Sequence, residues 1–171
     1  MKIVICFVQS NKTDTFVRRI SKKMERKEFC DKLLELRKAS DVRFIDICFA
    51  MKSTERSVYR IEKAEHSFSM NNALSYLAAI NIQMALKKGK GSFLLNEQED
   101  IFRWLKKNRE KNFSQRSLAE KVGCVDSTIT KIETGRANVG IDIFLQLADV
   151  LGFSIELSPK KLNEQLHTNK K

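Results

Sequence analysis

The feature that most constrains the fold is an internal repeat, in which the dipeptide Ile61-Glu62 recurs as Ile132-Glu133. The apolar positions around this dipeptide recur at the same offset without a gap, and we call two residues related by this offset equivalent. Other equivalent pairs are Leu34 with Leu105, Ile47 with Leu118, Val58 with Ile129, Leu74 with Leu145 and Leu86 with Leu157. Because apolar positions stay in phase over about sixty residues, we expect two copies of one supersecondary unit.

The repeat and the local composition divide the chain into five segments. We expect a basic N-terminal arm or strand at 1–27, a first domain at 28–86, a linker at 87–95, a second domain at 96–157, and a short C-terminal helix with a tail at 158–171. Glycine and lysine dominate the first part of the linker, 87–91, and suit a flexible connector. Ser158-Pro159 is a favourable helix start, because proline fits the first helical position.

The second copy shows four amphipathic segments with recognisable helix ends. The expected signals are a capping box at Asn96 and Glu99, an N-cap at Ser114 with a stop at Gly123, a cap at Asp126 with a stop at Gly135, and a fourth helix from Ile141 to Leu151. Ile129 and Ile132 should face inward. Residues 153–157 alternate as a half-buried strand does, so the fold class is mainly α, with short strands allowed after the fourth helix of each copy and at the N-terminus.

Residues 109–152 resemble the helix-turn-helix domain of the Cro/CI-type (XRE) family of repressors and antitoxins. The matching features are Ser114-Gln115, Leu118-Ala119, Gly123, Ile129, Ile132-Glu133, Gly135, and Leu147-Ala148 with Leu151. The resemblance implies tandem lambda-repressor-like domains of four or five helices, of which the first copy is degenerate. It also implies sequence-specific binding to double-stranded DNA and regulation of transcription, with repression as the expected outcome.

The exposed side of the third helix in the second copy is the expected reading surface, because a helix fits the major groove and short polar groups can bond to base edges. DNA contacts are predicted for Gln115, Ser127, Thr128, Lys131, Thr134, Arg136 and Asn138. In the family, the glutamine that opens the second helix supports phosphate or base contacts, and the resemblance gives Gln115 this role. Glu133 is expected to pair with Arg109 and to play a structural part.

The first copy departs from the family pattern at three positions. Phe44 replaces the glutamine, Lys52 replaces the turn glycine, and Ala64 replaces the glycine after the third helix. Lys38 and Glu62 are expected to form the structural pair. The third helix should expose Arg56, Ser57, Arg60 and Lys63. Two interpretations stay open: this basic set binds DNA, or the copy serves dimerisation or the binding of a partner protein.

Composition supports a polyanionic partner and excludes several other classes. The chain has 32 Lys and Arg against 21 Asp and Glu, a net charge of +11, and more than half of the excess lies in the segment 1–27. Four cysteines without a Cys-x-x-Cys pair and two histidines offer no zinc-ligand spacing, so no metal or other cofactor is expected. No P-loop or nucleophile motif is present, so we expect no enzyme. The apolar run Ile3–Val8 is too short for a membrane span, and a cytoplasmic location is expected.

The sequence leaves open how two reading helices are brought together and whether the protein also binds a protein partner. Two reading helices must lie about 34–36 Å apart to enter successive major grooves, and either a homodimer, the expected assembly, or the tandem pair must supply that spacing. An alternative function is an antitoxin-like module that neutralises a toxin or another regulator and autoregulates its operon. A further interpretation starts translation at Met24, which would remove almost half of the net charge and leave both copies intact.

Overall fold

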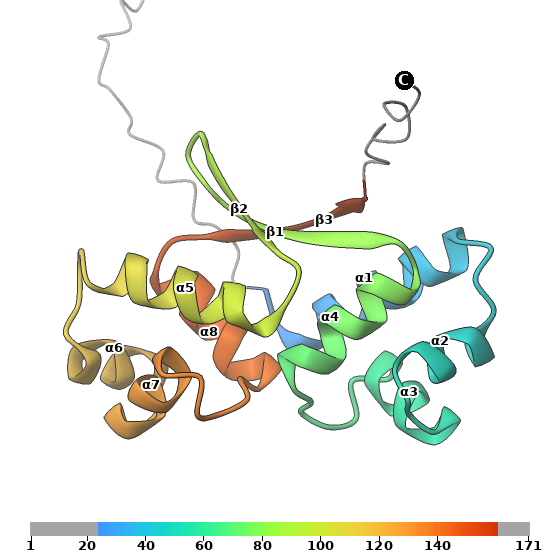
Figure 1. Ribbon diagram of the computed structural model, residues 1–171, viewed down its shortest axis with the longest axis horizontal. Coiled ribbons are helices and arrows are strands. Elements are labelled where there is room, and N and C mark those ends of the chain that lie inside the picture. Colours follow the sequence, from blue (N-terminus) through green and yellow to red (C-terminus); the bar gives the residue numbers. More distant parts are fainter. Residues whose placement is uncertain (1–23, 161–171) are drawn as a thin grey trace, which may run out of the picture.

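The computed structural model describes residues 24–160, which form eight α-helices and a small antiparallel sheet (Figure 1). The helices are α1 (Arg26–Ala39), α2 (Phe44–Ala50), α3 (Glu55–Glu62), α4 (Met70–Ala79), α5 (Gln98–Arg109), α6 (Gln115–Val122), α7 (Asp126–Glu133) and α8 (Ile141–Val150). The strands are β1 (Ile82–Lys88), β2 (Gly91–Leu95) and β3 (Ser154–Pro159). The expectation of a mainly helical protein is confirmed. The expected arm at 1–23 and tail at 161–171 lie outside the described residues.

Helix starts agree with the sequence in part. The Ser114 side chain accepts a hydrogen bond from the Ser117 backbone N–H at 3.1 Å, which confirms the predicted N-cap of α6. The capping box of α5 lies one residue later than predicted, because Glu97 is the N-cap and Asp100 reaches back to its backbone. Asp126 is the first residue of α7 and not its cap. Both errors are shifts of one residue at a helix start, where boundaries are least sharply defined.

Three helices in each half of the described chain end at a residue with a left-handed backbone. The second half uses Gly123, Gly135 and Gly152, with φ of 76°, 69° and 75°. The first half uses Lys52, Ala64 and Asn81, with φ of 50°, 54° and 57°. Asparagine tolerates this conformation, whereas a lysine or alanine there costs about 1–2 kcal/mol. The first half therefore keeps the same turns without the glycines that favour them.

The sheet has the order β2-β1-β3, with both pairings antiparallel. The predicted linker at 87–95 is wrong, because most of these residues belong to the hairpin of β1 and β2, whose register pairs Leu86 with Phe93. The predicted helix start at Ser158-Pro159 is also wrong, since both residues end β3. The strands allowed after the fourth helix of each copy are present as β1 and β3, and they pair with each other.

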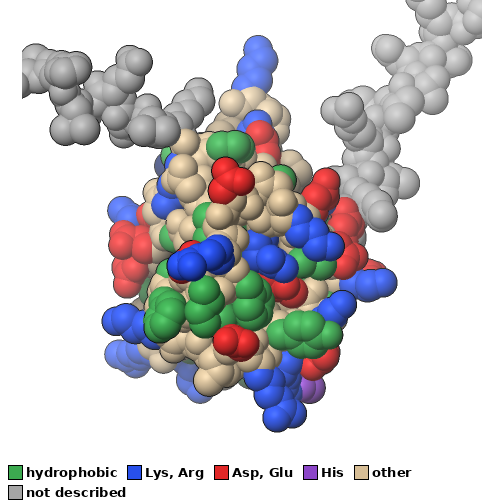
Figure 2. All heavy atoms as spheres, turned by 90° about the vertical axis from the view of Figure 1, so that its right-hand side faces the viewer, with side chains coloured by type: hydrophobic (Ala, Val, Ile, Leu, Met, Phe, Trp, Pro, Cys, Tyr) green, Lys and Arg blue, Asp and Glu red, His purple; other side chains and the backbone are tan. Residues whose placement is uncertain are grey.

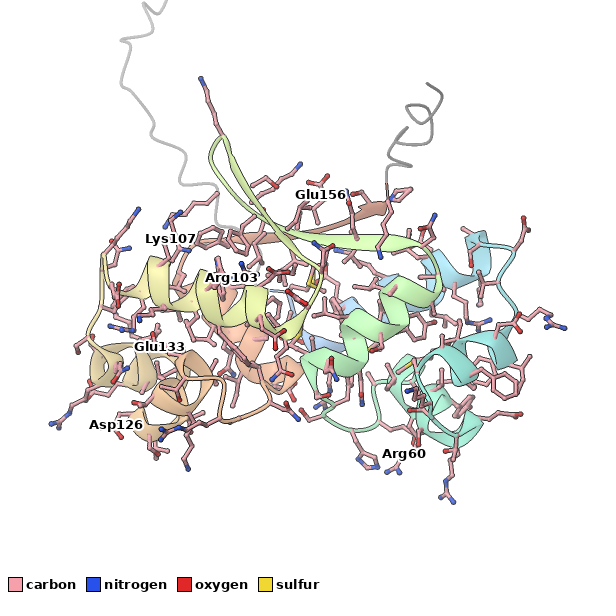
Figure 3. All side chains as sticks on the ribbon, in the orientation of Figure 1. Arg60, Arg103, Lys107, Asp126, Glu133 and Glu156 are labelled. Carbon is pink, nitrogen blue, oxygen red and sulfur yellow. The ribbon has the colours of Figure 1, made fainter. Side chains whose placement is uncertain are left out.

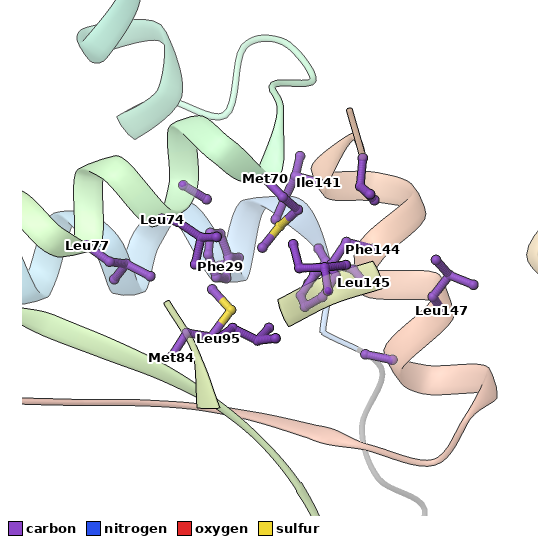
Figure 4. Close-up of a cluster of buried hydrophobic side chains, with 14 of the residues drawn as sticks. Phe29, Met70, Leu74, Leu77, Met84, Leu95, Ile141, Phe144, Leu145 and Leu147 are labelled. Carbon is purple, nitrogen blue, oxygen red and sulfur yellow. The ribbon is translucent and has the colours of Figure 1, made fainter. Parts of the chain in front are cut away.

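A single hydrophobic core includes residues from both halves of the described chain (Figure 4). Phe29, Met70 and Met84 from the first half lie in the same buried cluster as Phe144 and Leu145 from the second. Figure 1 shows the sheet along one side of the molecule and the pairs α2–α3 and α6–α7 along the opposite side. The shared core therefore fixes two helix pairs at one edge of a continuous body.

Candidate nucleic-acid interface

Helices α6 and α7 pack against each other across a short turn. Ala119 and Val122 of α6 are buried, as are Ile129 and Ile132 of α7, so the predicted inward pair on α7 is confirmed. Gly123 ends α6 in a left-handed conformation, which redirects the chain toward the start of α7. This packing uses one side of α7 and leaves the opposite side at the protein surface.

A carboxylate network ties α5, α6 and α7 together. Arg109 donates to both oxygens of Glu133, at 2.5 and 3.0 Å, which confirms the predicted pair. Gln115 donates from its amide nitrogen to Glu133 at 2.7 Å and accepts from the Thr130 hydroxyl at 3.0 Å. The hydrogen bonds from Arg109 raise the pKa of its guanidinium above the ordinary value. The network fixes the start of α6 against the middle of α7 and occupies Glu133 within the protein.

The outer side of α7 carries polar groups available to a ligand. Ser127, Lys131 and Arg136 are exposed, and their side chains have no hydrogen bond or ion pair with any residue that the structure describes. Thr128 is half-buried. Figure 3 shows the start of α7, marked by Asp126, at the lower edge of the molecule. These groups include an ammonium, a guanidinium and hydroxyls, which can bond to phosphates and base edges.

Three other predicted contact residues already have partners in the protein. The Thr134 hydroxyl donates to the Thr130 carbonyl at 2.8 Å. Asn138 accepts from the Gln98 amide at 2.8 Å, and both ends of the Gln115 amide are engaged in the network described above. A DNA contact through any of these side chains must share or replace an internal hydrogen bond.

Comparison with protein families gives one match in this region: the model of the helix-turn-helix family matches residues 105–157. This segment is a helix-turn-helix domain. The resemblance predicted for residues 109–152 is thereby confirmed, and the family is one of DNA-binding transcription regulators. No curated protein and no solved structure matches the chain.

In the first half of the chain, α3 is the helix whose residues are equivalent to those of α7. Arg56 is exposed and has no hydrogen-bonding or ionic partner among the described residues. Ser57 shares a hydrogen bond with the Thr54 hydroxyl at 2.9 Å, and Arg60 lies 3.5 Å from a carboxylate oxygen of Glu65. Lys63 is exposed and lies over the Tyr59 ring at 5.6 Å. The four predicted residues thus lie on α3 and at its C-terminal end, with Arg60 also at the lower edge in Figure 3.

The predicted pair of Lys38 with Glu62 is wrong, because Arg37 holds this carboxylate with bonds of 2.6 and 3.1 Å. Lys38 lies about 100° further around the helix and is exposed. The buried Tyr76 hydroxyl donates the third bond to Glu62, at 2.7 Å. Burial and this carboxylate raise the pKa of Tyr76, so the phenol stays protonated and remains a donor. Phe44, at the position of Gln115, lies under the Arg37 guanidinium at 5.4 Å.

Sequence reasoning missed an exposed hydrophobic surface on α2 and α3, which we call the apolar patch. It consists of Ile45, Phe49 and Tyr59, which are 37%, 75% and 50% exposed. Figure 2 shows hydrophobic side chains gathered on this end of the molecule. The spacing of Ile45 and Phe49, one helical turn apart on the side away from buried Ile47, could have revealed it.

The described residues offer little support for other kinds of site. Among residues 24–160, no group of three or more potential ligands could hold a metal ion. No helix in that range is long and apolar enough to cross a membrane. The cysteines Cys30 and Cys48 are buried, and burial raises the pKa of both thiols.

Proposed function

We propose that this protein is a sequence-specific DNA-binding regulator of transcription that reads the major groove with α7. The observation that carries the proposal is the helix-turn-helix match over a segment in which α7 presents unpaired polar side chains on its outer side. A helix of this kind enters the major groove with its N-terminal residues nearest the bases. Ser127 and Thr128, at the start of α7, are the proposed base readers, and Lys131 and Thr134 extend the same surface.

The remaining proposed contacts serve the DNA backbone. Arg136 and Asn138 follow α7 and are both exposed, so they can bind phosphates beside the groove. Gln115 acts through its two hydrogen bonds, which hold α6 and α7 in a fixed relation. The regulator is proposed to repress transcription, since a protein bound over a promoter excludes polymerase by its bulk. The first half of the chain is proposed to be a degenerate copy of the same domain.

The proposal is tested by selecting sequences from a random duplex library and measuring affinity for the selected and a scrambled duplex by fluorescence anisotropy. Replacing Ser127 with Ala should weaken binding to the selected duplex by about tenfold and relax its preference at one position. Lys131→Ala should weaken binding to both duplexes, and the slope of log affinity against log salt concentration should fall by the amount expected for about one phosphate contact. Lys107→Ala is the matched control, because it removes one exposed lysine on the side of α5 away from α7 (Figure 3).

Two outcomes would contradict this function. No enriched sequence after selection would mean that the protein does not read DNA. Equal losses for Lys131→Ala and Lys107→Ala would mean that binding depends on overall charge and not on α7.

The alternative function is an antitoxin-like module that neutralises a partner protein and autoregulates its operon. The apolar patch favours it, because exposed Phe49 and Tyr59 lie on a face that otherwise would meet DNA or water. Co-expression with the product of a co-transcribed neighbouring gene tests this alternative. A complex that Phe49→Ser weakens, with DNA affinity unchanged, would support it, and the absence of any complex would reject it for that neighbour.

A further inference from the structure

The two halves of the described chain contact each other through equivalent residues. Strand β1 follows α4, and β3 follows α8 at the same position of the repeat. Their antiparallel register pairs Met84 with Leu157 and Leu86 with Ile155, so the ladder is centred on Ala85 and Glu156, which are themselves equivalent. A ladder centred on equivalent residues has local two-fold symmetry, as an isologous dimer interface does.

A second contact repeats this symmetry at the starts of α4 and α8. The Met70 backbone N–H donates to the Val139 carbonyl at 2.7 Å, and the Ile141 N–H donates to the Phe68 carbonyl at 2.8 Å. Met70 is equivalent to Ile141, and Phe68 is equivalent to Val139, so the two bonds exchange under the same two-fold operation. Two reciprocal contacts and one shared core hold the halves in a single relation.

This relation places α3 and α7 on the same side of the molecule, opposite the sheet (Figure 1). A homodimer of one-domain helix-turn-helix proteins presents two recognition helices in this way, and each enters a major groove about one helical turn from the other. Here one chain supplies both helices through covalently linked halves. A second chain is therefore not required to complete the reading surface.

The two helices differ in chemistry at equivalent positions. Arg56 stands where α7 has Ser127, and Arg60 stands where it has Lys131. Arginine donates through a longer, forked group that reaches guanine or phosphate, whereas serine bonds at short range. A homodimer reads the same half-site twice, but these two helices have different preferences.

From these observations, and resting on the proposed function, we infer that one chain binds one duplex, whose site consists of two unlike half-sites. Helix α7 reads one half-site and α3 binds the other through Arg56 and its basic neighbours. We expect the half-sites to be centred about 10 base pairs apart, because two recognition helices on one side of a protein enter successive major grooves at that spacing. The selected DNA sequence is therefore not palindromic.

Stoichiometry and site symmetry test the inference with the full chain. Native mass spectrometry of the complex with the selected duplex should give one chain per duplex, and the selected consensus should lack two-fold symmetry. Insertion of either 5 or 10 base pairs between the half-sites should lower affinity by about tenfold or more, since a rigid body cannot follow the second half-site. A homodimer of independent chains would instead give two chains on a palindromic duplex, which would overturn the inference.

Variants separate this inference from the proposed function itself. Arg56→Ala should lower affinity by about tenfold and change base preference only in the half-site bound by α3. Lys90→Ala is the matched control, because Lys90 is exposed at the tip of the β1–β2 hairpin, on the side of the sheet. Specific binding that depends on Ser127 but not on Arg56 would refute the two-helix site and leave reading by α7 intact. Failure of the selection to enrich any sequence would refute both.

Discussion

Removing the hydroxyl of Tyr76 tests how the first half of the chain stabilises its buried carboxylate. Tyr76 is fully buried and donates to Glu62 at 2.7 Å, while Glu62 is only 6% exposed. A hydrogen bond to a charged group contributes about 1.5–3 kcal/mol to stability. Arg37 keeps its two bonds to the same carboxylate, so the charge stays paired in the variant. We therefore expect Tyr76→Phe to lower the free energy of unfolding by about 2 kcal/mol.

Urea and thermal denaturation, followed by circular dichroism, measure this loss. For a protein of this length, about 2 kcal/mol corresponds to a fall in Tm of about 4–8 °C. The other tyrosine, Tyr59, provides a matched control, because it is half-exposed and its hydroxyl has no hydrogen-bonding partner among the described residues. Tyr59→Phe should change stability by less than about 0.5 kcal/mol. Equal stability of the two variants would refute the importance of the Tyr76 bond.

Two further predictions concern strained turns and buried thiols. Ala64→Gly should stabilise the protein by about 0.5–1 kcal/mol, because relief of the left-handed strain exceeds the added entropy of the unfolded chain. Gly135→Ala should destabilise the protein, because it introduces left-handed strain and places the new methyl 3.2 Å from the Phe102 ring. Opposite signs in urea denaturation would check this, and equal signs would refute it. Burial raises the pKa of Cys30 to about 11, so a thiol reagent should label half-buried Cys124 before Cys30 in the native protein, as read by mass spectrometry. The Cys30 thiol ionises earlier in the unfolded chain, so its contribution to stability should fall as the pH rises from about 9 toward 11. Labelling of both thiols at the same rate would contradict the buried position of Cys30.

The helices and much of the candidate site could be predicted because their signals are local. Ser114 caps α6 and Gly123 ends it, and both effects depend on residues within one turn. Ile129 and Ile132 face the core because their spacing matches the helical period. The pair of Arg109 with Glu133 followed from the family pattern, which already encodes the tertiary contact.

The errors concern contacts that depend on distant parts of the chain. Glycines and lysines at 87–91 resemble a linker, but they form the end of the β1–β2 hairpin, where Lys87 pairs with Ser92 and Lys88 with Gly91. Pairing of β1 with β3 anchors the strand that leads into this hairpin. The repeat spacing predicts Lys38 as the partner of Glu62, whereas Arg37 forms the pair, because spacing alone cannot register a change of one residue in the loop that follows the helix. Tyr76 could not be linked to Glu62 from spacing, since the bond joins two helices across the core.

Each half has a glutamate with a buried side chain at an equivalent position, Glu62 or Glu133, but the uncharged donor to its carboxylate comes from a different helix in each half. This difference affects which surface residues can be substituted. In the helix-turn-helix domain, Gln115 reaches Glu133 from the start of α6, so the bond ties the surface of α6 and α7 to the core. In the first half, Tyr76 donates from α4 inside the protein, and Phe44 needs no polar role. The outer residues of α2 and α3 then take no part in the hydrogen bonds to the Glu62 carboxylate. Exposed Phe49 and the arginines of α3 can thus differ from their counterparts without loss of the helical framework, which is the condition for one chain to carry two unlike binding surfaces.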